Sequence, residues 1–327
     1  MGSLAEWFWN DQNWLPAGVK WHDIKSNATI TYPQIHELRY TLYGGFLLLI
    51  LRVMVESFVF VPIGYLGGWI ANPCTRIVEH VRGGFMGNSK FKRVAECGWR
   101  LCFYVFAFTL GFYVLYDTPQ FQDVKECWRD WPYHHLPGSV WWYYIIEASF
   151  YWSLFYGTLF FDVRRGDFYQ MMLHHAVTIV LLYISWSMNM VRIGTLILFS
   201  HDAADIFIEG TKIVRYAGWK MIVNCSFVIF LFVWISTRLV YYPFWVLWSV
   251  WFDAPSLIQT DYEWSNISQS PHVPRLLMVM LSTLLVLHIY WTYLILLVAY
   301  RSTKGAGVDD VREDDSDSED DDNKKEN

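Results

Sequence analysis

The chain contains several apolar stretches that are each long enough to cross a lipid bilayer, and this feature most constrains its fold. A spanning helix needs roughly 20 mostly apolar residues. Of the 327 residues, 54% are hydrophobic and only 17% are charged, whereas soluble domains are about one quarter charged. We therefore predict an all-α membrane protein with about seven transmembrane helices. They are expected near Tyr40–Ile70, Gly98–Tyr116, Val140–Phe161, Phe168–Met188, Arg192–Gly210, Trp219–Tyr242 and Arg275–Tyr300.

The basic residues between these segments predict how the chain is oriented. Lys and Arg are concentrated in alternate loops, which by the positive-inside rule face the cytosol. The other loops hold few, such as Lys125 and Arg129. We therefore expect a lumenal N-terminus and a cytosolic C-terminus. Two N-x-S/T sequons, at Asn27 and Asn266, fall on the expected lumenal side; we predict glycosylation of Asn27, while Asn266 is closer to the bilayer.

The C-terminal segment differs from the rest of the chain. Residues 301–327 hold 5 basic and 11 acidic residues, which accounts for the whole net charge of −6. Such a segment cannot bury enough apolar surface to fold, so a disordered tail is predicted. Ser316 and Ser318 each precede an acidic residue by three positions, which favours phosphorylation. The terminal "KKEN" resembles a dilysine retrieval signal, which predicts residence in the endoplasmic reticulum membrane.

Ionisable side chains interrupt two neighbouring apolar segments. The stretch "MMLHHAVTIVLLYISW" carries His174 and His175, and the next one carries Asp202 and Asp205. Counting about 1.5 Å per residue from the expected cytosolic ends places all four about 10–15 Å deep. The two histidines are adjacent and so point about 100° apart, whereas the aspartates, three residues apart, share a face. Ionisable groups inside a span are expensive and usually functional.

Imidazole and carboxylate groups together suit acyl transfer or proton transfer. A neutral imidazole can take a proton from a nucleophile, and a nearby carboxylate can orient the ring. A structural hydrogen-bond cluster or a proton relay would use the same residue types. No ligand spacing requires a metal, so we expect none, and no glycine-rich phosphate loop is present.

The stretch "HHAVTIVLLYISWSMNMVRIGTLILFSHDAADIFIEGTK" resembles the Lag1 motif of ceramide synthases, which belong to the TRAM–Lag1–CLN8 (TLC) domain family. The likeness covers roughly Lys92 to Arg301. About 30 residues separate the first two spans, too few for the homeobox-like domain of many members, so the chain resembles members without it. We expect a lumenal segment (1–39), a first helix (40–70), a cytosolic linker (71–91), the catalytic membrane domain (92–301) and the tail (302–327).

The resemblance implies an enzyme that transfers a fatty acyl group from acyl-CoA to the amine of a sphingoid base. Its essential groups would be His174, His175, Asp202 and Asp205, and six of the seven spans would ring the cavity for the acyl chain. Acyl-CoA would be a co-substrate, with no permanently bound cofactor. Membrane lipids and a homodimeric or heterodimeric partner are expected, but no nucleic acid.

Two further groups of residues, one basic and one mostly aromatic, could either bind substrate or reflect ordinary features of a membrane protein. Coenzyme A is a polyanion, and basic side chains near the expected site could hold its phosphates, or could reflect the positive-inside rule alone. These are Arg164, Arg165, Lys212, Arg215 and Lys220. In similar proteins the loop before the last span influences acyl length; here its aromatic content equally fits an interfacial belt. The candidates there are Trp251, Phe252, Asp253 and Ser256.

Two chemical routes and two other protein classes remain open. In one route a histidine takes a proton from the attacking amine; in the other a histidine ring is acylated first. A non-enzymatic, translocon-associated or lipid-sensing TLC protein is the alternative function. The paired histidines argue against it, and no repeat of broken helices favours a transporter.

Overall fold

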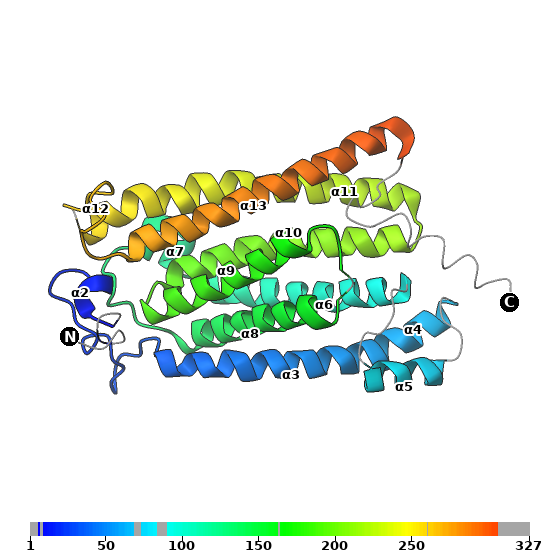
Figure 1. Cartoon of the computed structure of the whole chain (residues 1–327), viewed down its shortest axis with the longest axis horizontal. Coiled ribbons are helices and arrows are strands. Elements are labelled where there is room, and N and C mark those ends of the chain that lie inside the picture. The colour runs from blue at the N-terminus through cyan, green and yellow to red at the C-terminus, as the bar shows by residue number, and fades with distance from the viewer. Residues whose placement is uncertain are drawn as a thin grey trace.

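The computed structural model describes residues 6, 9–68, 73–83, 90–162, 164–259 and 261–306. Throughout this described part the regular structure is helical. Figure 1 shows the long helices running side by side along one axis. The longer helices are α3 (Arg39–Val55), α6 (Lys90–Leu115), α8 (Gly138–Phe160), α9 (Phe168–Ser187), α10 (Val191–Tyr216), α11 (Lys220–Trp234) and α13 (Val273–Arg301). The shorter helices are α2 (Asp11–Trp14), α4 (Val61–Leu66), α5 (Pro73–Gly83), α7 (Pro119–Gln122), α12 (Ala254–Ile258), the 3₁₀ turns η1 (Ile35–Leu38) and η3 (Val124–Cys127), and the π-helical segments η2 (Glu56–Phe60), η4 (Ile235–Leu247), η5 (Ser249–Asp253) and η6 (Ser302–Ala306).

Five helical segments of the described chain are long and apolar enough to cross a membrane. They are Ile35–Leu66, Phe91–Leu115, Phe168–Ser187, Met221–Ile258 and Val273–Lys304. The helices α8 and α10 lie beside these five segments (Figure 1) and are not among them; α8 is rich in Tyr and Trp, and α10 carries acidic residues. The expectation of an all-helical, multi-pass membrane protein is confirmed.

The second expected span starts earlier than predicted. The helix α6 begins at Lys90 rather than near Gly98, so that Lys92, Arg93 and Arg100 lie inside a helix and are buried. The positive-inside rule had counted these side chains among the cytosolic basic residues of positions 71–100. The expected linker 71–91 is also partly helical, because it contains α5. Basic residues can continue a buried helix where acidic partners neutralise them, as Glu209 and Asp162 do for Arg100.

Two expected helices are longer or less regular than predicted. The first passes from α3 through η2 into α4 and ends at Leu66. The helix that begins with α11 continues through η4 and η5 to the end of α12 at Ile258, well past the expected end at Tyr242. The expected loop residues Trp251, Phe252, Asp253 and Ser256 are therefore helical. Pro243 lies inside η4, where it cannot donate a backbone hydrogen bond.

The bundle has two ends that differ in what covers them (Figure 1). At one, here called the α12 end, α2 and α12 lie near the starts of α8 and α13. The other, here called the α5 end, holds α4 and α5 on one side and the last turns of α13 on the opposite side. The N-terminal segment packs over the α12 end: Thr31 accepts a backbone hydrogen bond from Leu136, and the Trp186 indole donates to the carbonyl of Gln34. Leu15, Ile24 and Tyr32 form its own small apolar cluster.

Candidate active site

A cavity of about 230 Å³ lies within the bundle, between α6, α8, α9, α10, the helix formed by α11 and η4, and α13. His174, His175 and Asp205 all line it. Asp202 is buried, and it is absent from the cavity wall. Three of the four predicted catalytic residues therefore face one space.

The two histidines come from the second turn of α9 and are held between aromatic rings. Tyr151 of α8 lies 6.4 Å from each imidazole, measured between ring centroids, and Trp291 of α13 lies 5.4 Å from His174 at a near-perpendicular angle. The Trp291 indole donates a 2.9 Å hydrogen bond to Asp167, the residue before α9, and so fixes the start of that helix. The buried Nδ1 atom of each imidazole has no hydrogen-bond partner among the described residues.

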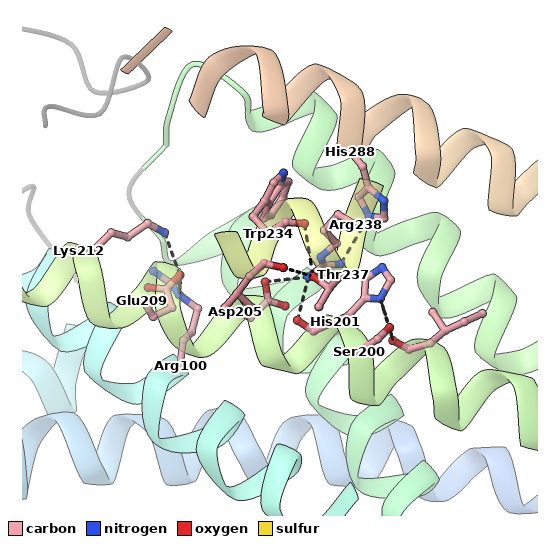
Figure 2. Close-up of polar contacts among 12 residues, drawn as sticks. Arg100, Ser200, His201, Asp205, Glu209, Lys212, Trp234, Thr237, Arg238 and His288 are labelled. Carbon is pink, nitrogen blue, oxygen red and sulfur yellow. Dashed lines mark hydrogen bonds and ion pairs between the residues drawn. The ribbon is translucent and has the colours of Figure 1, made fainter. Parts of the chain in front are cut away.

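Asp205 is paired with a cation from another helix rather than with a histidine. The guanidinium of Arg238, which is 3% exposed, donates to Asp205 Oδ1 and to the carbonyl of His201, each at 3.0 Å (Figure 2). A second nitrogen of the same group lies 3.5 Å from Nε2 of His288. Both Arg238 and His288 line the cavity. Arg238 lies in the π-helical η4, a kind of irregularity often found at functional sites.

Asp202 has a different neighbour. Its nearest titratable neighbour is Glu147 on α8, and both side chains are fully or almost fully buried. Among the described residues, Oδ2 of Asp202 and both carboxyl oxygens of Glu147 have no hydrogen-bond partner. The pair joins α8 to α10 next to the cavity, so Asp202 lies one helical turn away from Asp205 in sequence but contacts a different neighbour.

The predicted coenzyme A residues separate into two groups. Arg165, Lys212 and Arg215 line the cavity at the α5 end. Arg164 does not line the cavity; it is exposed and lies 4.9 Å from the centre of the Phe168 ring. The side chain of Lys220 lies outside the described residues.

Buried ion pairs surround the cavity at this end. Lys212 lies 2.9 Å and Arg100 lies 3.2 Å from the same oxygen of Glu209 (Figure 2). Arg100 also approaches Asp162, in the link between α8 and α9, to 3.7 Å. Burial by itself would raise the pKa of the Asp162 carboxyl, but the guanidinium groups of Arg52 and Arg100 outweigh it and hold that pKa below its usual value.

A second, smaller cavity of about 50 Å³ continues from the histidines toward the α12 end. It shares Tyr151 and His174 with the first cavity, and reaches Trp128 and Val250. Most of its other lining side chains are Leu and Ile. Gly194 lies on its wall, where an added Cβ would come within 2.7 Å of the Tyr144 hydroxyl.

The remaining predicted residues lie at the α12 end or beyond the described chain. Trp251 stacks on Trp264, with ring centroids 5.2 Å apart, and Phe252 packs on Trp248. Asp253 is 3.8 Å from Lys125, and the Ser256 hydroxyl donates to the Asp253 carbonyl. Asn27 is exposed, and its Oδ1 accepts hydrogen bonds from the hydroxyl and backbone of Thr29. Asn266 is also exposed. Ser316 and Ser318 lie outside the described residues.

Sequence reasoning missed Arg238, His288, Arg100 and Glu209 as site residues. Arg238 carried a usable signal, because an arginine within "FVWISTRLVYYPF" is a charge in an otherwise apolar span. His288 had the same signal in α13. Arg100 fell at the start of the expected span Gly98–Tyr116, but it was counted with the basic residues that precede that span.

Comparison with known proteins identifies the family. The TLC domain pattern matches residues 93–297. Ceramide synthase hyl-2 of Caenorhabditis elegans is 45% identical, over 94% of this chain and 93% of that protein. Ceramide synthase hyl-1 of the same organism is 42% identical over 94% of this chain and 84% of its own length. Human ceramide synthase 3 is 33% identical over 96% of this chain and 89% of its own length. The chain belongs to the TLC domain family, among its ceramide synthases. The resemblance seen in the sequence is therefore confirmed.

The TLC domain match includes the cavity-lining histidines, Asp205 and Arg238, since all fall between residues 93 and 297. The helices α3, α4 and α5 precede that range, although α3 packs along α8.

Proposed function

We propose that the protein is an acyl-CoA-dependent sphingoid base N-acyltransferase, which forms dihydroceramide or ceramide. The observation that carries this proposal is the cavity that brings His174, His175 and Asp205 together within a chain whose relatives are ceramide synthases. A polar site partway along a membrane-spanning bundle suits two amphiphilic substrates, because their reacting ends are polar and their tails are apolar. The same observations favour the enzyme over a non-enzymatic TLC protein.

In this proposal seven helices span the membrane, namely α3 with α4, α6, α8, α9, α10, α11 with η4, and α13. The last six enclose the two cavities. The α5 end would face the cytosol, because its rim is basic, and the α12 end would face the lumen of the endoplasmic reticulum. Asn27 would then be open to glycosylation. Acyl-CoA would enter at the α5 end, with phosphate groups near Arg165, Lys212 and Arg215.

The acyl chain would extend from the histidines into the second cavity. Its lining is almost wholly apolar, so each buried methylene of the chain would contribute about 0.8 kcal/mol. The reach of this cavity to Val250 brings the segment that carries Trp251 and Phe252 close to the methyl end of the chain. If this segment influences which acyl chain length is accepted, we expect Val250 to be the residue of the segment that contacts the chain.

Two routes fit the cavity. In the first, the neutral amine attacks the thioester carbonyl while a histidine takes the amine proton; the C–N bond forms, the C–S bond breaks, and the coenzyme A thiolate leaves and receives a proton. In the second, an imidazole nitrogen attacks first, the thiolate leaves, and the amine then displaces the imidazole. In both, Arg238 would supply positive charge near the carbonyl oxygen as it becomes negative.

The test is to incubate the purified protein in detergent with sphinganine and acyl-CoAs of several chain lengths, and to measure amide by mass spectrometry. Amide formation that depends on both substrates is expected; no amide at any chain length would refute the proposal. Acyl-CoA alone separates the routes. A covalent acyl-protein that is lost in His174→Ala or His175→Ala supports the second, and its absence on rapid mixing supports the first.

A further inference from the structure

From outside the matched TLC domain, the first long helix places a charged side chain against two residues of the cavity wall. Arg52 of α3 is 1% exposed. Its guanidinium lies 2.8 Å from Glu56 Oε1 and 2.7 Å from Asp162 Oδ1, and 3.9 Å from Glu96 Oε1. Arg52 and Glu56 come from the first helix, whereas Glu96 comes from α6 and Asp162 follows α8. One side chain thus joins three separate parts of the bundle.

Glycines make room for this contact. A Cβ atom at Gly157, near the end of α8, would lie 3.0 Å from a terminal nitrogen of Arg52. On α3, a Cβ at Gly45 would lie 2.7 Å from Cβ of Trp152. Small residues at helix contacts let two backbones approach closely in a membrane. A glycine on each helix, Gly45 on α3 and Gly157 on α8, therefore permits the close approach of the two helices. This approach places Arg52 beside the last turn of α8.

The partners of Arg52 belong to the cavity. Glu96 and Asp162 both line it. Asp162 lies 3.7 Å from Arg100, which pairs with Glu209, and Glu209 pairs with Lys212. Arg52 is therefore the first member of a chain of alternating charges that ends at the basic rim. The link that holds Asp162 also holds Arg165 of that rim.

We propose that Arg52 is a positioning residue for the coenzyme A end of acyl-CoA. The inference rests on the proposed function. By neutralising Glu96 and Asp162, Arg52 keeps the cavity mouth attractive to phosphate and leaves Arg100 to pair with Glu209. Without that positive charge, the excess of buried negative charge on the wall would repel phosphate and draw Arg100, already 3.7 Å from Asp162, away from Glu209. The first helix would thus be a working part of the site as well as a membrane anchor.

The test compares Arg52→Gln and Arg52→Lys with the unaltered protein. The matched control is Arg39→Gln, an exposed arginine of the same helix. KM is measured separately for acyl-CoA and sphinganine, together with kcat and Tm in detergent. In Arg52→Gln, KM for acyl-CoA should rise on the order of tenfold, the scale of a lost buried charge partner. KM for sphinganine should change less than about twofold, Arg52→Lys should be intermediate, and Arg39→Gln should match the unaltered protein.

A charge-balanced variant guards against misfolding. Arg52→Gln combined with Asp162→Asn removes one positive and one negative charge, and should bring KM for acyl-CoA back to within about threefold of the unaltered value. This variant decides the question if Arg52→Gln alone does not fold. A tenfold rise in the double variant, or a fall in Tm and kcat in Arg52→Gln with unchanged KM for acyl-CoA, would overturn the inference. Absence of amide product from the unaltered protein would instead refute the proposed function, and the inference with it.

Discussion

The two ends of the bundle hold their helices together by different means. At the α5 end, buried charges such as Arg52, Arg100 and Glu209 join helices by ion pairs. At the α12 end, hydrogen bonds between uncharged groups connect the segments. The Trp131 indole donates to the Met188 carbonyl, and the Trp128 indole donates to Ser249. Ion pairs are costly to bury, and neutral bonds are cheaper. Charge is therefore concentrated where the proposed coenzyme A end enters, and it is sparse around the proposed acyl tail.

The largest expected effect lies between these two regions, at the histidines. His174→Ala and His175→Ala should each lower the rate of amide formation roughly 100-fold or more, because proton transfer or nucleophilic attack is lost. The measurement is kcat with saturating sphinganine and acyl-CoA. His36→Ala, an exposed histidine at the α12 end, is the control and should leave the rate unchanged. Near-normal activity in both cavity variants would remove the histidines from the chemistry.

Arg238 is expected to give the next largest effect. In Arg238→Met the Asp205 carboxylate loses its cation, and the carbonyl oxygen loses a nearby positive charge. We expect kcat to fall on the order of 100-fold, as for other lost electrostatic stabilisers of an oxyanion. In Arg238→Met combined with Asp205→Asn the charge is balanced, so Tm should recover while kcat stays low. Recovery of kcat together with Tm would mean that Arg238 acts only through folding.

The sequence alone predicted the helices well and their side-chain partners poorly. Apolar length identifies a span because insertion depends on composition, and His174 and His175 were placed correctly within α9. The three-residue spacing of Asp202 and Asp205 predicted that both carboxyl groups would face the same site. Residues three apart on a helix are still about 60° apart, which is enough for one to meet Glu147 and the other Arg238.

Partners from distant segments could not be found by spacing. Arg238 lies 33 positions after Asp205, and Asp162 lies 110 positions after Arg52; only the packing of the helices brings them together. The positive-inside rule also gave the wrong surroundings for a basic residue of α6. That rule assumes that a cluster of Lys and Arg is solvated, whereas Arg100 is buried among carboxylates.

A smaller effect is expected in the apolar cavity. Leu181 lines it, and Leu181→Ala would lengthen the space available to the acyl chain. An acyl chain two carbons longer would then bury about 1.6 kcal/mol more, so its kcat/KM relative to the parent length should rise roughly tenfold. Competition between acyl-CoAs, read by mass spectrometry, measures the ratio. Leu287→Ala removes a buried leucine that lines neither cavity, and should leave the ratio unchanged. An equal shift in both variants would refute the assignment of the cavity.

The smallest effect is expected at the neutral α12 end, where His134 is buried in the link before α8. Burial lowers the pKa of His134 to about 4, and its Nε2 donates to the Arg129 carbonyl. The unfolded chain, with a pKa near 6.5, therefore binds more protons than the folded one between about pH 6.5 and 4. Stability is full above pH 6.5 and falls as the pH drops through this window.

From pH 6.5 to 5.5, the unfolding equilibrium should shift by up to about tenfold, which is roughly 2–4 °C in Tm. In His134→Gln an amide keeps a donor but cannot titrate, so its Tm should fall less over the same interval. Parallel curves for the two proteins would show that another group controls the acid sensitivity of this end.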